Sequence, residues 1–172
     1  MGTVVRLTKL TESSLIVHWC TFADGIVKTV AKGGRRQKGS FAGKLDLFVE
    51  AEIVWQPSRS SELHALREVE VLDYREGLRK IYGQTLAATY FCQLVEMTTE
   101  PGVEIGDFAG LLKRGLDYLN GQVDVRAVRF FEKEMAKLLG VASKERTAAN
   151  SLREHCGDLP RTREELMNLL EI

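Results

Sequence analysis

Residues 14–32, SLIVHWCTFADGIVKTVAK, carry the pattern that decides the fold of the N-terminal half. Two runs in this stretch, Ser14–Phe22 and Ile26–Lys32, are rich in the β-branched and aromatic residues that favour strands. The three residues between them, Ala23-Asp24-Gly25, contain an Asp-Gly pair typical of a tight turn between antiparallel strands. The stretch therefore predicts a β-hairpin.

The second strand of this hairpin separates charged from apolar side chains. Successive side chains of a strand point to opposite faces, so Lys28 and Lys32 share one face. The other face carries Val27, Thr29 and Ala31. A face with two lysines does not pack into a core, so we expect the face of Val27 to point inward.

Three further strands surround the hairpin. Thr3–Leu10 precedes it, and Leu45–Trp55 alternates apolar with mainly polar residues, which places Trp55 on the core face. Glu62–Leu72 follows a turn cluster at Pro57–Ser61. Five short strands with short connections predict a small Greek-key barrel of the OB type, and an SH3-like barrel fits the pattern nearly as well.

The apolar period changes to three and four residues from about Arg75, which indicates amphipathic helices. We expect helices near residues 75–98, 105–119 and 125–139, with Asp124 as the N-cap of the third. Residues 142–158 are polar and weakly patterned. Thr162-Arg163-Glu164-Glu165 has the form of a capping box and predicts a short last helix through Leu170.

These patterns predict an α+β protein in two parts. Residues 1–73 form a five-stranded OB-type barrel that binds nucleic acid, and residues 74–172 form a small α-helical domain. No apolar run reaches the length of a membrane span, and no basic-then-apolar signal peptide opens the chain, so we expect a cytoplasmic protein.

Charge is sorted along the chain. The protein contains 24 Lys and Arg against 24 Asp and Glu, yet its first 50 residues hold 8 against 4. Cations spread over about twenty residues without an acidic neighbour suit an extended, repeating anion such as a nucleic-acid backbone. The expected phosphate contacts are Lys28, Lys32, Arg35, Arg36, Lys38 and Lys44.

Two aromatic residues near these cations are candidates for stacking on bases, which commonly accompanies charge in the binding of single strands. Phe41 lies within the basic segment, and Phe48 lies off the apolar face of its predicted strand. We expect Phe41 to contribute to DNA binding.

Several kinds of site are excluded by spacing. Gly34–Ser40 has the two glycines of a phosphate loop but lacks its lysine, and no following helix is predicted. No nucleophile-and-base arrangement can be argued, so no catalytic residues are expected. Cys20, Cys92 and Cys156 lie far apart, and His155 adds at most one more ligand, so we expect no metal site.

Three blocks of sequence, taken together, resemble the RecO family of bacterial recombination mediators. They are Leu10–Leu15 (LTESSL), Ala31–Lys38 (AKGGRRQK) and Arg129–Gly140, which begins RFFE and ends LLG. The resemblance implies an OB domain followed by a helical domain, with no enzymatic activity and no cofactor. It also implies binding of single- and double-stranded DNA, strand annealing and recombinase loading during DNA repair.

The resemblance implies two protein partners, RecR and the acidic-hydrophobic C-terminal tail of single-stranded DNA-binding protein. A peptide of that kind needs a hydrophobic pocket edged by cations. The positions considered for it lie in the helical half, where solvated helix-face charges are the simpler reading: Arg129, Lys113, Arg114 and Arg126.

The chain departs from the family pattern after Gly140. Many members continue there into a zinc ribbon with paired cysteines, whereas this chain has no Cys-x-x-Cys, so we expect a short member without zinc. Two alternatives stay open on the sequence. The chain is a protein-interaction adaptor that has lost DNA binding, or it is an RNA-binding OB module.

Overall fold

The computed structural model describes residues 1–171, which divide into two compact units. The first unit comprises Met1–Arg75 and Thr99–Gly106, and the second comprises Glu76–Thr98 and the chain from Asp107 onward. The domain boundary predicted from the sequence, after residue 73, places Thr99–Gly106 in the helical domain. In the structure this segment returns to the barrel, where Pro101 bridges to Ile26.

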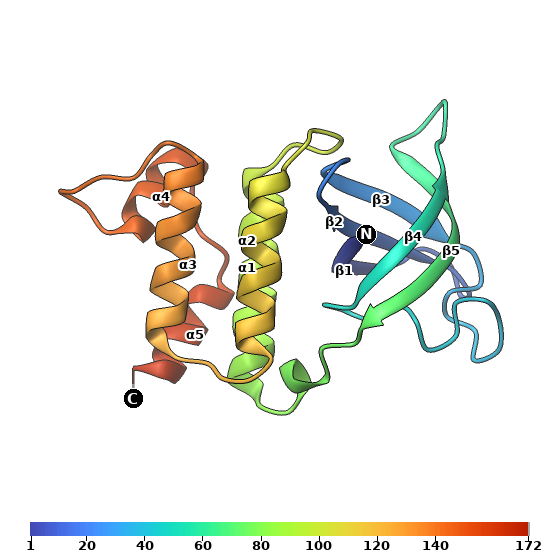
Figure 1. The fold of residues 1–172 in the computed structure, drawn as a ribbon, viewed down its shortest axis with the longest axis horizontal. Coiled ribbons are helices and arrows are strands. Elements are labelled where there is room, and N and C mark those ends of the chain that lie inside the picture. Colours follow the sequence, from blue (N-terminus) through green and yellow to red (C-terminus); the bar gives the residue numbers. More distant parts are fainter. Residues whose placement is uncertain (172) are drawn as a thin grey trace. The chain divides into compact units, whose positions relative to one another are not determined.

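The first unit is a closed barrel of five strands (Figure 1). The strands are β1 (Gly2–Lys9), β2 (Leu15–Thr21), β3 (Ile26–Ala31), β4 (Glu50–Gln56) and β5 (Leu63–Asp73). Their order around the barrel is β1-β2-β3-β5-β4, and β4 closes back onto β1. Neighbouring strands are antiparallel except β3 and β5. This is the OB arrangement, so the OB prediction is confirmed over the SH3-like alternative.

The barrel core follows the predicted alternation along β3. Val27, Thr29 and Ala31 are buried, whereas Lys32 is exposed and Lys28 is half-buried. The indole Nε1 of Trp19, a fully buried side chain, donates a hydrogen bond to Thr29 Oγ1 at 2.9 Å. The hydroxyl inside the core is therefore satisfied, which removes the cost of burying it.

The predicted strand at Leu45–Trp55 starts too early, because β4 begins only at Glu50. Phe48 has a φ of 69°, a left-handed conformation that breaks an extended strand. Leu45 and Leu47 pack against the barrel core from a loop. Their alternation therefore reflects burial without strand pairing.

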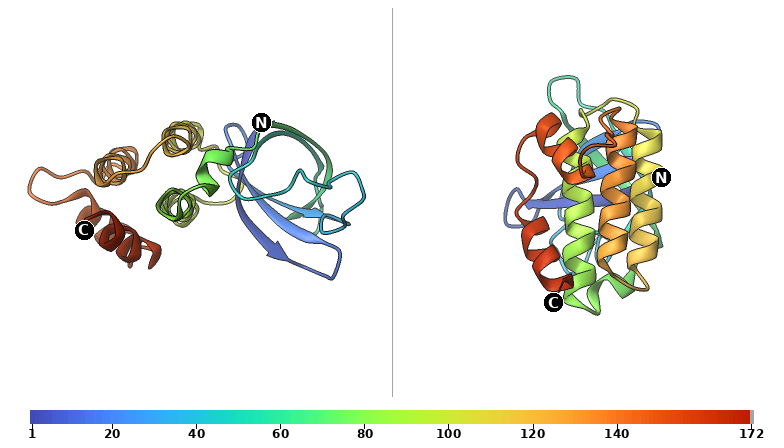
Figure 2. Two further views of the ribbon diagram at one scale, coloured as in Figure 1. Left: turned by 90° about the horizontal axis from the view of Figure 1, so that it is seen from below. Right: turned by 90° about the vertical axis from the view of Figure 1, so that its left-hand side faces the viewer.

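Among residues 1–171, the second unit contains one 3₁₀ helix and five α-helices, and α1, α2 and α3 lie side by side with nearly parallel axes (Figure 2). The elements are η1 (Glu76–Arg79), α1 (Tyr82–Thr98), α2 (Gly106–Leu119), α3 (Val125–Leu138), α4 (Ala148–Cys156) and α5 (Thr162–Leu170). Asp124 caps α3 as predicted, because its Oδ1 accepts a hydrogen bond of 2.8 Å from the backbone N–H of Ala127.

Two sequence expectations for the C-terminal part need correction. The polar stretch 142–158 contains α4, whose N-cap is Thr147 and whose Leu152 is fully buried. The last helix exists, but Thr162 does not cap it. The Thr162 hydroxyl instead donates a hydrogen bond of 2.6 Å to Gln93 Oε1 on α1. The first residue of the predicted capping box therefore links α5 to α1.

A buried polar cluster joins α1, α3 and α5. The Glu132 carboxylate on α3 accepts hydrogen bonds from Arg163 Nε at 2.5 Å and from the Tyr90 hydroxyl at 2.7 Å. Burial, followed by the charge of Glu132, raises the pKa of Tyr90 far above its ordinary value. The cluster therefore keeps Tyr90 neutral and Arg163 charged. Among residues 1–171, no helix combines the length and apolar character needed to cross a membrane.

Candidate nucleic-acid interface

Five of the six cations singled out in the sequence lie on one loop of the barrel, the basic loop, which we define as residues 32–44 between β3 and β4 (Figure 1). The sixth, Lys28, lies on β3 itself. The loop leaves β3 through Gly33, whose φ of 72° favours glycine. It is anchored to the β1–β2 turn, because the backbone N–H of Arg35 donates to Ser13 O at 3.0 Å. Two loops of the OB barrel therefore meet at one end of the strands.

Three cations of the basic loop are available to a ligand. Lys32, Arg36 and Lys38 are exposed, and their side chains have no partner among residues 1–171. Free ammonium and guanidinium groups on one loop produce a local positive potential that attracts phosphates. These three residues form the accessible part of the predicted site.

The other three predicted cations already have partners. Arg35 donates through Nη1 to the carbonyl oxygens of Glu12 at 2.8 Å and of Thr11 at 3.2 Å, so it joins the two loops. Lys44 Nζ donates to Val69 O at 3.0 Å and is half-buried. Lys28 forms an ion pair of 3.3 Å with Glu62. A ligand phosphate would have to compete with these contacts.

The two expected stacking residues are buried, which corrects that prediction. Phe41 is 6% exposed and belongs to the barrel core, and Phe48 is 2% exposed. The basic loop folds back so that its one aromatic side chain fills the barrel and holds the loop in place. Neither ring is accessible to a base in this conformation.

The helical unit contains an apolar pocket of about 480 Å³ between α1, α2 and α3. Phe91 and Phe131 stack at its base with ring centroids 3.7 Å apart. Phe130 also lines the pocket, and because it lies off the apolar stripe of α3 its side chain is 62% exposed. The exposed aromatic residue next to a buried one in Arg129-Phe130-Phe131 is the sequence signal that could have identified this pocket.

Two of the four cations considered for a partner peptide line this pocket, namely Arg114 and Arg126. Lys113 does not line it and forms an ion pair of 3.5 Å with Asp117. Arg129 lies on another side of α3, where it forms an ion pair of 2.7 Å with Glu171. The structure therefore brings together half of the predicted set.

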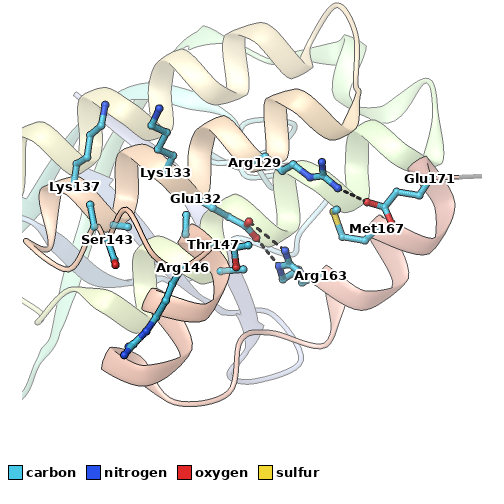
Figure 3. Close-up of a pocket in the computed structure, with 14 residues that line it drawn as sticks. Arg129, Glu132, Lys133, Lys137, Ser143, Arg146, Thr147, Arg163, Met167 and Glu171 are labelled. Atoms are coloured by element: carbon cyan, nitrogen blue, oxygen red, sulfur yellow. Dashed lines mark hydrogen bonds and ion pairs between the residues drawn. The ribbon is translucent and has the colours of Figure 1, made fainter.

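Arg129 borders a separate, more polar cavity of about 660 Å³ formed by α3, α4, α5 and the segment before α4 (Figure 3). The close-up shows that Arg129 and Arg163 each point toward a carboxylate, Glu171 and Glu132 respectively. Lys133, which lines the same cavity, has no partner among the residues described. Most of the charged residues that line this cavity therefore belong to ion pairs.

The barrel of this chain is similar to a known protein family. A family model described as "Recombination protein O N terminal" matches residues 1–75, which are the barrel strands and their connections. The chain is 28% identical over 145 residues to the DNA repair protein RecO of Syntrophus aciditrophicus. It is 31% identical over 109 residues to the protein of the same name from Cyanothece sp..

A third relative, the DNA repair protein RecO of an Exiguobacterium species, is 28% identical over 142 residues. The matches to the Syntrophus and Exiguobacterium proteins each cover 82% of this chain, but only 55% and 56% of those proteins. The match to the Cyanothece protein covers 62% of this chain and 36% of that protein. The chain thus spans about half the length of the curated relatives it matches. The barrel is therefore similar to the N-terminal part of recombination protein O, and the longer matches are to proteins named DNA repair protein RecO.

Proposed function

We propose that this chain binds single- and double-stranded DNA through the basic loop and acts in DNA repair as a recombination mediator. The observation that carries the proposal is the set of three exposed, unpaired cations, Lys32, Arg36 and Lys38, on one loop of an OB barrel. OB barrels commonly bind oligonucleotides with their strand face and loops. The names of the matched relatives support a role in DNA repair.

The chemistry of the loop suits phosphates on either form of DNA. Its free groups are donors on flexible side chains, and no exposed aromatic residue of the loop is present to select single strands. Contacts of this kind bind the backbone without reading the base sequence. Strand annealing requires such sequence-independent binding, and we include annealing and recombinase loading in the proposed function.

We propose further that the apolar pocket of the helical unit binds the C-terminal tail of single-stranded DNA-binding protein. An acidic tail that ends in an aromatic residue needs an apolar cavity with cations at its edge. The pocket provides both, because Phe130 and Phe131 line it together with Arg114 and Arg126. RecR is a further proposed partner, supported only by the resemblance of the sequence to the RecO family.

The experiment that tests the DNA proposal compares two triple variants in fluorescence-anisotropy titrations with labelled single-stranded DNA. Replacing Lys32, Arg36 and Lys38 with alanine removes the free cations of the loop. The control replaces three exposed lysines of the helical unit, Lys80, Lys133 and Lys144, with alanine, which changes the net charge equally.

We expect the loop variant to bind DNA at least tenfold more weakly than wild type at low salt, and the control to bind within about threefold of wild type. Equal weakening in both variants would show that only net charge matters and would overturn the placement of the site. A titration with RNA of the same sequence addresses the alternative class of ligand. A strong preference for RNA would contradict the DNA proposal.

A further inference from the structure

A half-buried tryptophan lines a pocket at the other end of β3. Trp55 packs partly against the barrel core, yet it also borders a cavity of about 360 Å³. The sequence alone places Trp55 in the core, but a register shift in the pairing of β4 with β5 falls between Val54 and Trp55. The extra residue of this irregularity is Arg67 on β5, and irregularities of this kind occur at barrel rims.

The polar groups of this pocket suit a nucleobase better than a phosphate. His64 lines the pocket, and its Nδ1 accepts a hydrogen bond of 3.0 Å from the backbone N–H of Ser58. In the neutral ring the hydrogen is then on Nε2, which can donate to a ligand. Asp24 and Glu62 also line the pocket, where the charge of Glu62 is paired with Lys28, and their carboxylates can accept hydrogen bonds from a base.

The pocket is continuous with the surface proposed to bind phosphates. Lys28 lines the pocket from the outward face of β3, and Lys32, exposed, directly follows the last residue of that strand. Four residues of a strand span about 13 Å. A single strand that crosses this face can therefore place its backbone on Lys32 and the basic loop while one base turns toward Trp55. Sites on OB barrels extend over about 4–16 nucleotides, which includes this distance.

We propose that Trp55 stacks on one unpaired base of a bound single strand, with the base held in the pocket between the β2–β3 turn and the start of β5. The proposal rests on the proposed DNA binding and adds to it a site that distinguishes single strands from duplex. A paired base in a duplex is stacked on its neighbours and cannot enter the pocket. The ligand class is therefore unpaired nucleic acid.

The test uses the intrinsic fluorescence of the full chain, which has two tryptophans. Trp19 is fully buried in the core and serves as the internal reference. Titration with a mixed-sequence single-stranded oligonucleotide should quench the emission, with saturation at the concentration at which anisotropy of labelled DNA saturates. The Trp55→Phe variant should bind DNA without this quenching. Duplex DNA should bind wild type without it as well.

A second variant measures the contribution to affinity. Trp55→Leu keeps an apolar side chain against the core but removes the stacking surface, so its Kd for single strands should rise about 5- to 150-fold. Its Kd for duplex should stay within about twofold of wild type. Wild-type binding of single strands without quenching would overturn the stacking site and leave the phosphate site standing. Absence of binding to any DNA would overturn both. The comparison of wild type with Trp55→Phe does not depend on how well the Leu variant folds.

Discussion

The ion pair that closes the barrel offers the sharpest stability prediction. Arg75 Nη2 lies 2.6 Å from Glu50 Oε2, and the side chains are 0% and 6% exposed. Arg75 Nη1 also donates to Phe48 O at 2.7 Å, in the loop before β4, and to Thr3 Oγ1 on β1 at 3.4 Å. Replacing Arg75 with Met removes the positive charge and all the guanidinium donors, and it leaves the Glu50 carboxylate buried beside an apolar side chain.

Removing one partner of a buried pair costs about 3–5 kcal/mol. A folded domain is stable by only about 5–15 kcal/mol, so this loss is a large fraction of the total. With a urea m-value of about 2 kcal/mol/M, the unfolding midpoint should fall by about 2 M. The backbone at position 75 has a φ of 47° in wild type, and Met meets the same strain there, so the change tests the loss of the guanidinium contacts without an added backbone cost.

The assay is urea unfolding followed by tryptophan emission. Trp19 and Trp55 both belong to the barrel unit, so the signal reports that unit. Arg59→Met, the same substitution at an exposed loop position, is the matched control and should change stability by less than about 0.5 kcal/mol. The Arg75→Met/Glu50→Gln double variant should lose less stability than the two single variants together. A midpoint shift below about 0.5 M for Arg75→Met would refute the reasoning.

Two further predictions concern the helical unit. Asp124→Ala should destabilise it by about 1 kcal/mol, because the N-cap acceptor for Ala127 N–H is lost. That hydrogen bond lowers the pKa of Asp124 below its ordinary 3.8, so the stabilisation is present above pH 3.8 and lost as the pH falls through the lowered value. Thermal melts of wild type and variant should converge there, and a constant difference would contradict the cap. The second prediction concerns the apolar pocket. The double variant Arg114→Glu/Arg126→Glu should bind an acidic peptide that ends in an aromatic residue at least tenfold more weakly than wild type, as measured by calorimetry. The Arg129→Glu variant should weaken this binding less than threefold. The reverse order would place the peptide at Arg129.

Local periodicity determined most of the barrel and the long helices. Lys28 and Lys32 on one side of β3, opposite Val27 and Ala31, could be recognised because a strand has only two faces. The order of strands needs long-range pairing that no local pattern contains, and only the number of strands and their short connections indicated it.

The errors arose where tertiary contacts override local patterns. Leu45 and Leu47 alternate like a strand, but the positive φ of Phe48 ends the extended conformation before β4. Thr162 has the sequence of a cap yet bonds to Gln93 on another helix. Gln93 lies 69 residues from Thr162 along the chain, so no local window of sequence reveals that contact.

For the candidate site, sequence identified the charges but not their state. Lys32, Arg36 and Lys38 cannot be told from Arg35 and Lys44 by spacing, because the carbonyl acceptors of the latter two come from other segments. The prediction that Phe41 stacks on a base is wrong because the side chain is buried in the barrel core. That burial depends on the closure of the barrel, which no local pattern reveals.

The most direct test of DNA binding through the basic loop is the salt dependence of the affinity of wild type for single-stranded DNA. Three free cations that each neutralise one phosphate predict a log-log slope of about −2, from about −0.7 per contact on single strands. The Lys32, Arg36 and Lys38 triple alanine variant should bring the slope close to zero. A wild-type slope shallower than about −0.7, or no binding at low salt, would contradict the account.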